Sequence, residues 1–375
     1  MDKKRLIEAY KDKNVYITGI TGFKGGWLAL MLHELGANVS GIGLDPDQDD
    51  GIFYQARIDE IADVTIGDIV EPADTTKLIP SIIKANPDYI FHMAAQPIVS
   101  EGYKDPFNTF NTNIMGTVML HEVIRGLRLP ASKENLENGH CAKIDDENLS
   151  CKKISIINIT TDKVYKEENR PLKEDDKMFG FDPYSLSKTC SDMISSCYRD
   201  ALKSPHYIST MRAGNVIGGG DMAVNRIIPD IVRATRAGEI VKIRSPYSVR
   251  PYQHVFDALS AYLWVAMLQR EDKSYQGEYN VGPDIDQTMQ TYELVEKMQD
   301  YLDFKWENTG KSIGKESNYL ALDNTKIKSV GWVPAYPTND LVVEAVSKWY
   351  NKSMQGEDMQ KITLNQIKEA FNSYE

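Results

Sequence analysis

The chain has few cysteines, no long apolar run and no excess of basic charge, and each of these features excludes a class of protein. Its four cysteines, Cys141, Cys151, Cys190 and Cys197, lack the spacing of metal ligands, so we expect no metal site and reduced thiols in a cytoplasmic protein. The most membrane-like stretch, 259–268, is far too short to span a bilayer. The N-terminus also lacks the apolar core of a signal peptide.

The charge balance is acidic. The chain carries 43 Lys and Arg against 54 Asp and Glu, a formal net charge of −11, which argues against nucleic acid or an anionic membrane as a partner. A hydrophobic content of 42% and a charged content of 26% are ordinary for a soluble globular protein. With 375 residues, the chain has room for one large domain or two smaller ones.

Short apolar runs alternate with helical patterns in the first half of the chain. This alternation predicts an α/β fold: a Rossmann-type doubly wound parallel sheet with helices on both faces. We expect strands at 15–18, 39–44, 64–66, 89–93, 154–159 and 207–211. We expect helices at 75–85, 108–127, 227–237, 257–269, 292–301 and 340–350, and one beginning at Tyr184.

The same patterns suggest how the chain divides. Residues 1–205 form the expected nucleotide-binding domain, interrupted by a polar insertion at about 129–153. Residues 206–350 form a smaller, mixed α/β substrate-binding domain, with some segments returning to the first. We expect the remainder, 351–375, to be a tail with a polar linker and a short helix.

A glycine-rich loop between the first expected strand and its helix predicts a dinucleotide site. The loop reads Thr18-Gly19-Ile20-Thr21-Gly22-Phe23-Lys24-Gly25. Its glycines permit a tight turn, a close approach to a pyrophosphate and close packing of helix on strand, and the helix N-terminus offers unpaired amides. Asp45, at the end of the next expected strand, suits a ribose with free hydroxyls. With no Arg beside Asp45, the pattern favours NAD over NADP.

Tyr184 and Lys188 are the first catalytic candidates. They are four residues apart, so they share one face of a helix. We expect the lysine ammonium to lower the pKa of the phenol and make it a general base. The run Thr160-Thr161-Asp162-Lys163 follows another expected strand and brings hydroxyl, carboxylate and amine groups to the same edge of the sheet.

Together these motifs resemble the extended branch of the short-chain dehydrogenase/reductase superfamily, and within it the nucleotide-sugar 4,6-dehydratases, most closely the CDP-glucose group. Further motifs carry the resemblance over about 14–350, namely 92–97, 113–117, 182–188, 212–221, 250–255 and Gly331-Trp332. The chain departs from the pattern at Met222, where Trp is expected, in the short segment between Tyr165 and Asp182, and in the polar insertion. The first two departures flank the expected sugar pocket and leave the substrate open.

The resemblance implies a three-part reaction with NAD on a bound CDP-hexose. Tyr184 takes the proton of the hydroxyl at sugar carbon 4, Thr161 hydrogen-bonds that hydroxyl, and Lys188 holds the nicotinamide ribose. Asp162 is the acid for water loss, and the product is a 4-keto-6-deoxy sugar. Lys163 stands where related enzymes have a Glu base; it acts either as a neutral base or as an electrostatic anchor for the enolate, and the sequence leaves both open.

The resemblance also assigns binding residues. The expected cofactor contacts are Gly19, Thr21, Gly22, Phe23, Lys24, Gly25, Asp45, Asp68, Ile69, Ala94, Ala95, Gln96, Thr160, Tyr184 and Lys188. Asp68 and Ile69 would meet the adenine, and Asn113 would support the helix that carries Tyr184. The expected substrate contacts are Gln96, Asn215, Arg226, Arg250 and His254, the last of these with structural packing as its alternative.

Three alternative functions remain at this stage. A nucleotide-sugar 4-epimerase needs the Tyr, the Lys and NAD but no water loss, and its relatives carry small residues where Asp162 stands. A non-catalytic NAD-binding sensor would not need Thr161, Tyr184 and Lys188 together. A dehydratase acting on another nucleotide sugar is the third alternative. The resemblance also implies a homodimer that pairs the helix at 108–127 with the helix that begins at Tyr184.

Overall fold

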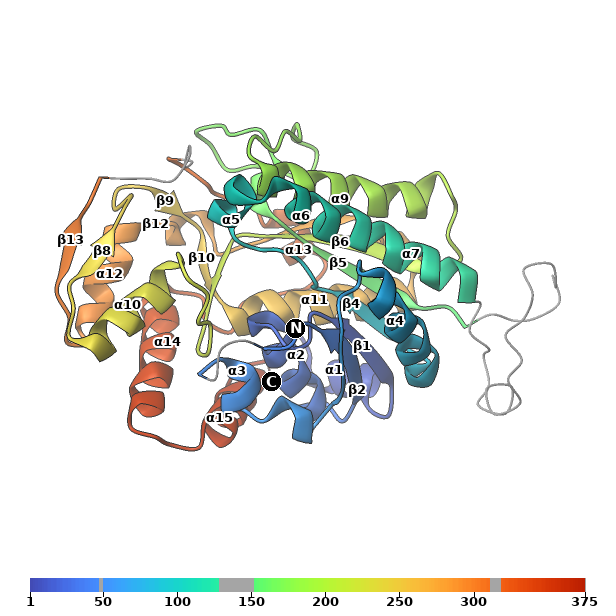
Figure 1. Cartoon of the computed structure of the whole chain (residues 1–375), viewed down its shortest axis with the longest axis horizontal. Helices are drawn as coiled ribbons and strands as arrows, with labels where there is room; N and C mark the ends of the chain where they lie inside the picture. Colours follow the sequence, from blue (N-terminus) through green and yellow to red (C-terminus); the bar gives the residue numbers. More distant parts are fainter. Residues whose placement is uncertain (47–49, 128–151, 311–317, 375) are drawn as a thin grey trace.

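A parallel sheet of seven strands forms the larger part of the computed structural model, which describes residues 1–46, 50–127, 152–310 and 318–374 (Figure 1). The strands lie in the order β11-β6-β5-β4-β1-β2-β3, and all neighbouring pairs are parallel. The predicted doubly wound sheet is confirmed, with its switch point between β1 and β4. The strands are β1 Asn14–Thr18, β2 Asn38–Gly43, β3 Asp63–Ile66, β4 Tyr89–His92, β5 Ser155–Thr161, β6 Tyr207–Ala213 and β11 Glu278–Val281.

Two hydrophobic cores form because alternate residues of each strand face opposite sides of the sheet. Val15 and Ile17 of β1 belong to the core that includes α2, α11 and α15, whereas Tyr16 belongs to the core with α4, α7 and α9. Burial on both faces explains why the central strands read as continuous apolar runs. The helices of this part are α1 Lys3–Tyr10, α2 Phe23–Glu34, α3 Ile52–Gln55, α4 Pro72–Ala85, α5 Val99–Lys104, α6 Pro106–Phe110, α7 Gly116–Leu127, α9 Pro183–Asp200, α11 Val255–Glu271 and α15 Met359–Asn372.

The helix expected at 108–127 is interrupted. Between α6 and α7 lies a π-helical segment, η2 Asn111–Met115, and the short helix α5 precedes α6. A π-helical turn widens the helix by one residue and often marks a functional position. Here it contains Asn113, which is 1% exposed.

A smaller part is built mainly from the second half of the chain and lies at one end of the sheet (Figure 1). Its strands form three two-stranded sheets, β10 with β7, β12 with β9 and β13 with β8. The strands are β7 Asn215–Ile217, β8 Val241–Ile243, β9 Val249–Arg250, β10 Tyr252–His254, β12 Met289–Gln290 and β13 Trp306–Asn308. The helices are α10 Ile227–Ala237, α12 Thr291–Gln299, α13 Thr325–Ser329 and α14 Asn339–Met354, and single 3-10 turns are η1 Ile58–Glu60, η3 Asp162–Val164, η4 Lys273–Tyr275 and η5 Ile285–Gln287. β6 and β11 belong to the large sheet, and α11 packs against it.

The C-terminal segment differs from the polar linker and short helix that we expected after Lys352. Helix α14 continues to Met354, and α15 follows after residues 355–358. Phe371 of α15 is fully buried, with its ring edge-on to Phe256 and the ring centroids 4.9 Å apart. Ile367, Ala370 and Phe371 follow the i, i+3, i+4 spacing of a buried helical face, a signal masked by the polar residues around them.

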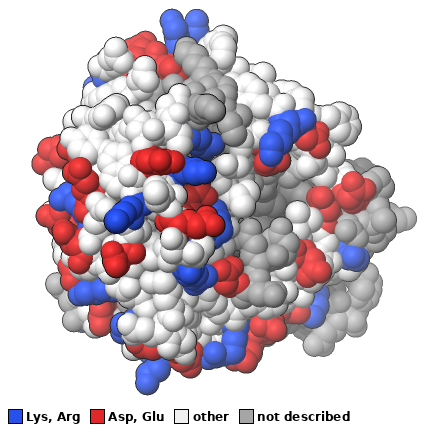
Figure 2. Space-filling model, turned by 60° about the vertical axis from the view of Figure 1, so that its left-hand side comes forward, with Lys and Arg blue, Asp and Glu red and all other residues white. Residues whose placement is uncertain are grey.

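Charged side chains of both signs are interspersed over the face shown in Figure 2. Among the residues that the structure describes, no helix is long and apolar enough to cross a membrane. Most of the predicted insertion, residues 128–151, lies outside the described residues, and so do Cys141 and Cys151. Cys190 and Cys197 are free thiols.

Candidate active site

A cavity of about 550 Å³ opens at the carboxyl ends of β5 and β6, where it is also lined by residues of the smaller part. This volume is typical of small-ligand sites. The sheet contributes the ends of two adjacent strands, because carboxyl ends of parallel strands meet at one edge. The predicted site residues that line the cavity are Lys24, Thr160, Thr161, Asp162, Lys163, Tyr184, Asn215, Arg226 and Arg250.

The start of α9 places Tyr184 in the cavity wall. The helix begins after Asp182, whose side chain accepts a hydrogen bond from the Ser185 backbone N–H at 3.0 Å, and Pro183 occupies the first helical position. Both features are favourable for starting a helix at this point. Tyr184 therefore sits in the first turn, and its hydroxyl is hydrogen-bonded to Thr161, at the end of β5.

The expected lowering of the phenol's pKa is wrong for the chain alone. Burial raises the pKa of Tyr184 to about 12, and the Arg226 charge and the Thr161 hydrogen bond only partly oppose this effect. The Lys188 Nζ instead donates to the Ile159 carbonyl oxygen at 3.0 Å. Burial also lowers the pKa of Lys188, to about 8, and the Asp192 carboxylate opposes this. The helical spacing correctly placed the pair on one face but could not reveal the surroundings that shift the two pKa values.

Asp162 is buried beside the two hydroxyl-bearing residues. Its side chain is 2% exposed, and its Oδ1 accepts a hydrogen bond from the Thr161 hydroxyl at 2.9 Å. Its Oδ2 is buried and has no protein partner. Because an unsatisfied buried oxygen is costly, this atom is free to meet a ligand group in the cavity that the residue lines.

Two lysines approach this carboxylate from different elements. The Lys163 Nζ lies 4.0 Å from Asp162 Oδ1, and its side chain is 27% exposed. Lys24, at the start of α2, also lines the cavity. Burial, followed by the charges of Arg226 and Lys188, lowers the pKa of Lys24 to about 7.

The glycine-rich loop has the predicted form. Gly19 has a φ of +76°, and a Cβ there would lie 2.8 Å from the Ala94 backbone nitrogen, so the loops after β1 and β4 are in close contact. A Cβ at Gly25 would lie 2.1 Å from the Gly19 carbonyl oxygen. At Gly22, the N-cap of α2, the nearest atom would be 3.4 Å away, in ordinary contact. Internal packing therefore explains Gly19 and Gly25, whereas Gly22 leaves space beside the free amides of α2, a cradle that fits a pyrophosphate.

The predicted residues for the adenosine half lie outside the cavity described above. Asp45 is exposed just beyond β2, and Asp68 follows β3 with its Oδ1 accepting from the Val70 N–H at 3.0 Å. Ile69 does not offer its side chain to an adenine, because it is 3% exposed and packed in the core. A Cβ on Gly116 would lie 2.6 Å from its Cδ1. At the end of β2, a Cβ on Gly43 would lie 2.3 Å from the Thr21 Oγ1, so the glycine-rich loop packs closely on this strand.

Asn113, in the π-helical turn η2, holds the loop that follows β4. Asn113 Oδ1 accepts from the Gln96 N–H at 2.8 Å, and its Nδ2 donates to the Ser187 hydroxyl at 2.8 Å. Asn113 thus contacts the helix of Tyr184, as expected. The Gln96 amide donates to Thr109 at 2.8 Å and accepts from the Ile98 N–H, so this side chain is engaged within the protein and does not line the cavity. Ala94 and Ala95 are half-buried in the same loop, as is Phe23 in the glycine-rich loop.

Three of the predicted substrate residues line the cavity, but His254 does not. Arg226 forms an ion pair with Asp221 at 2.9 Å, and Arg250 is 8% exposed and donates to the Val249 carbonyl at 2.9 Å. Asn215 lies at the start of β7. His254 is fully buried, burial lowers its pKa to about 3, and its Nδ1 accepts from the Phe256 N–H as the N-cap of α11. His254 therefore has the structural packing that was the alternative to a substrate contact.

Several lining residues were missed from the sequence. Lys242 and Arg244 follow one another at alternate positions along and after β8, and Phe179 and Phe181 stand in the segment before α9. The two phenylalanines are 56% and 66% exposed, which is unusual for large aromatic side chains. Alternating charged residues in a short strand could have indicated the first pair; nothing local indicated that the second pair lines a cavity.

Comparisons with known proteins agree with this geometry. A family model described as GDP-mannose 4,6 dehydratase matches residues 16–345. The chain is 37% identical to a CDP-glucose 4,6-dehydratase of Salmonella typhimurium, over 97% of this chain and 98% of that protein.

Solved structures of related proteins share the fold. An epimerase from Methanothermobacter thermautotrophicus has a TM-score of 0.76 at 16% identity, covering 96% of this chain and 97% of its own. A UDP-glucose 4-epimerase from Stenotrophomonas maltophila, with bound NAD and a formylated UDP-arabinopyranose, has a TM-score of 0.73 at 18% identity, covering 92% and 100%. On the sequence match over most of its length, the chain belongs to the GDP-mannose 4,6-dehydratase family.

Proposed function

We propose that this protein is an NAD-dependent nucleotide-sugar 4,6-dehydratase that converts CDP-glucose to CDP-4-keto-6-deoxyglucose and water. The observation that carries the proposal is Asp162, which lines the same cavity as Tyr184 and Thr161 and has a buried carboxylate with one unpartnered oxygen. Of the protein's side chains, oxidation at carbon 4 by NAD needs only the two hydroxyls, whereas expulsion of a hydroxyl from carbon 6 also needs an acid. The relative at 37% identity supports CDP-glucose as the substrate.

The residues at the carboxyl ends of β1, β2 and β4 fit a dinucleotide. Gly22 and the amides of α2 would hold the pyrophosphate, and Asp45 would hold the adenosine ribose. NAD, when bound, accepts the hydride of carbon 4, returns it to carbon 6, and carries a positively charged ring. A positive charge beside a buried phenol favours the phenolate, and this opposes the effect of burial on the pKa of Tyr184.

In the proposed reaction Tyr184 takes the proton of the carbon-4 hydroxyl while Thr161 holds that oxygen. The resulting ketone acidifies the hydrogen on carbon 5. A base removes this proton, the electron pair forms the double bond to carbon 6, and Asp162 protonates the departing hydroxyl to give water. Lys188, whose Nζ donates to the Ile159 carbonyl oxygen at 3.0 Å, would hold the nicotinamide ribose.

We infer that Lys163 acts as an electrostatic anchor. Its Nζ stands 4.0 Å from a carboxylate, and an ammonium there stabilises negative charge that develops on the carbon-4 oxygen. The alternative is that neutral Lys163 is the base at carbon 5. A Lys163→Arg variant separates these roles, because guanidinium keeps the charge but cannot accept the proton. We expect this variant to retain more than a tenth of the wild-type rate, and Lys163→Met to retain less.

The decisive experiment incubates the protein and NAD with CDP-, dTDP-, GDP- and UDP-linked hexoses and follows product mass. We expect loss of one water, fastest with CDP-glucose, and no activity in Tyr184→Phe. An isomer of unchanged mass would instead identify a 4-epimerase. Preference for another nucleotide would overturn the substrate, and full activity of Tyr184→Phe would overturn the mechanism.

We also infer a homodimer through α6, η2 and α9. These neighbouring helices expose four large apolar side chains: Phe107 (79%), Met115 (50%), Leu186 (42%) and Met193 (59%). Apolar side chains gathered on adjacent helices are typical of an interface between subunits. Light scattering after gel filtration should give twice the chain mass, and Phe107→Glu with Met193→Lys should give the monomer. Tyr247→Glu, at an exposed aromatic away from these helices, is the control and should remain dimeric.

A further inference from the structure

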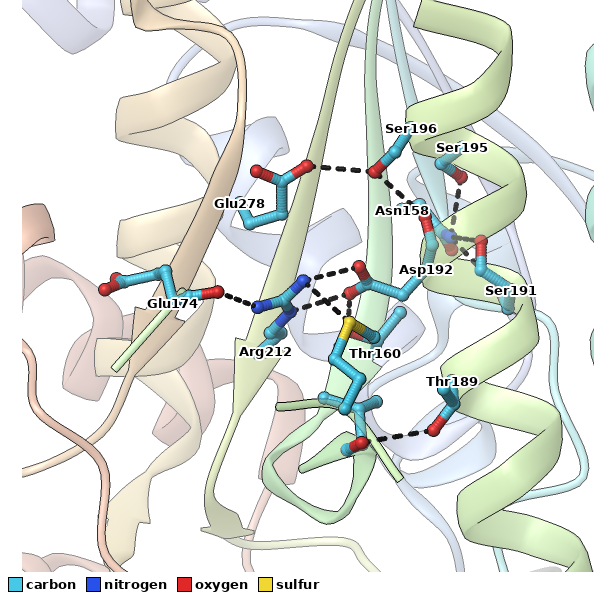
Figure 3. Close-up of polar contacts among 12 residues, drawn as sticks. Asn158, Thr160, Glu174, Thr189, Ser191, Asp192, Ser195, Ser196, Arg212 and Glu278 are labelled. Carbon is cyan, nitrogen blue, oxygen red and sulfur yellow. Dashed lines mark hydrogen bonds and ion pairs between the residues drawn. The ribbon is translucent and has the colours of Figure 1, made fainter. Parts of the chain in front are cut away.

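An ion pair deep in the molecule joins the catalytic helix to the large sheet. Arg212 of β6 is 3% exposed and Asp192 of α9 is 1% exposed. The guanidinium binds the carboxylate through two hydrogen bonds, Nε to Oδ2 at 3.0 Å and Nη2 to Oδ1 at 2.8 Å (Figure 3). Thr160 of β5 donates its hydroxyl to the same Oδ2 at 3.0 Å. Asp192 lies one turn after Lys188, so the pair fixes the helix close to the reacting groups.

The same arginine also holds a segment without regular structure. Its Nη1 donates to the Tyr165 hydroxyl at 2.9 Å and to the Glu174 carbonyl oxygen at 2.8 Å. Its Nη2 contacts the Met178 sulfur at 3.4 Å, and the guanidinium lies over the Tyr165 ring, 5.1 Å from its centroid. One side chain therefore contacts three points of the segment 165–178 and the catalytic helix at once.

This segment forms a wall of the candidate active site. Tyr165, Lys166, Glu167, Phe179 and Phe181 line the cavity. Few backbone bonds join the segment to the rest of the chain. The Tyr165 N–H donates to the Asp162 carbonyl, the Phe179 N–H donates to the Val164 carbonyl, and Leu172 donates to the Ala321 carbonyl and accepts from the Asp323 N–H. Two more bonds lie within the segment, from the Lys166 N–H to the Lys177 carbonyl and from the Asp176 N–H to the Lys173 carbonyl. With so few bonds, the position of the wall depends on side-chain contacts such as those of Arg212.

Stability alone is a weak reason for such a pair. Burying both charges costs about as much as their attraction returns, so apolar replacements are often equally stable. The pair can instead fix positions, because the planar guanidinium of Arg presents its N–H donors in set directions and so orients the groups that it binds. The placement of the pair between helix and wall therefore indicates control of position.

We propose that Arg212 and Asp192 are positioning residues, which fix the 165–181 wall of the substrate cavity against the helix of Tyr184 and Lys188. That the 165–181 segment is a wall for the hexose rests on the proposed function. The contacts by which Arg212 joins this segment to α9 do not depend on it. Neither residue lines the cavity, so both act through the residues that they hold.

The chain contains a matched control. Arg199 of α9 and Glu278 of β11 also join this helix to the sheet, at 2.7 Å with side chains 13% and 24% exposed. This pair has no hydrogen bond to the 165–178 segment among the described residues. Glu278→Gln thus removes a comparable ion pair from the same helix while leaving the wall bonded.

The experiment compares Arg212→Lys, Glu278→Gln and wild type by hydrogen exchange and by substrate kinetics. We expect at least tenfold faster amide exchange at Lys166 and Phe179 in Arg212→Lys only, because Lys keeps the charge but loses the fork. We also expect at least a tenfold higher KM for the nucleotide sugar, with thermal midpoints of the two variants similar. Tyr165→Phe removes a single hydroxyl that Arg212 binds. It should raise the amide exchange rate and the KM as Arg212→Lys does, but by a smaller factor. This variant replaces Arg212→Lys in the test if Arg212→Lys fails to fold.

Equal exchange and equal KM in Arg212→Lys and Glu278→Gln would overturn the proposal and leave the pair a structural one. Faster exchange with no turnover of any nucleotide sugar by the wild type would instead support the link and reject the proposed function. The two failures are therefore distinguishable in one set of measurements.

Discussion

Two glycines of the same loop should respond differently to alanine. At Gly22 the backbone angles, φ −82° and ψ 172°, suit any residue, and an added Cβ would have its nearest neighbour at 3.4 Å. Alanine restricts the unfolded chain more than glycine does, and this stabilises the folded protein by about 0.4–1 kcal/mol. Alanine is also a poor N-cap residue, which costs a similar amount. We therefore expect the free energy of unfolding of Gly22→Ala to stay within about 1 kcal/mol of wild type.

At Gly25 the added Cβ would lie 2.1 Å from the Gly19 carbonyl oxygen and 2.7 Å from the Ile20 Cα. Both are backbone atoms, so α2 must shift from β1. Overpacking of this kind costs about 1–3 kcal/mol. Gly25→Ala should therefore lower the thermal midpoint of the chain without any ligand.

Calorimetric titration with NAD completes the comparison. The methyl group of Gly22→Ala would fill the space beside the α2 amides, so we expect at least a tenfold weaker affinity, about 1.4 kcal/mol. Gly25→Ala should lose both stability and binding. If Gly22→Ala bound NAD as tightly as wild type, the proposed place of the pyrophosphate would be wrong. Wild-type stability of Gly25→Ala would refute the packing argument.

Three further predictions concern the acid, the lysine and the C-terminal helix. Asp162→Asn keeps the size of the side chain but cannot donate the proton to the leaving hydroxyl, so kcat for water loss should fall about 100- to 10,000-fold; wild-type formation of the dehydrated mass would contradict this. Because the folded pKa of Lys188 is lowered from 10.5 to about 8, its ammonium is lost at lower pH than in a free lysine. We expect kcat/KM of the free enzyme to fall as pH rises through about 8, and a profile flat to pH 10 would contradict the assignment. Phe371→Ala opens a cavity under α15 and should cost about 3–5 kcal/mol in denaturant unfolding; a loss below about 1 kcal/mol would show that α15 is dispensable.

Local patterns predicted the elements that local chemistry determines. The glycine spacing and the apolar runs each act within a few residues, and the sequence located both. It placed the start of α9 at Tyr184, one residue after the first helical residue, Pro183. The predicted lowering of the Tyr184 pKa was wrong, because the burial that raises this pKa comes from elements far along the chain. Gln96, Ile69 and His254 look available in the sequence but are engaged or buried by partners that no spacing reveals.

The same limit explains the residues that were missed. Arg212 and Asp192 are 20 positions apart on a strand and a helix, and only the packing of α9 on β6 brings them together. Likewise α15 shows a buried face only once α2 and α11 are in place to cover it. Long-range contacts thus account for most of what the sequence did not disclose.

The order in which the strands join the sheet restricts how the molecule can be divided. A chain cut after residue 205 would retain β5 but lose β6, its neighbour, and β11 beyond it. One edge of the Ser155–Thr161 strand would then expose its unpaired backbone amides and carbonyls. All seven residues of this strand are buried in the intact protein. Such a fragment should self-associate, and during synthesis the nascent chain must keep this edge from pairing wrongly until β6, which ends at Ala213, has been made.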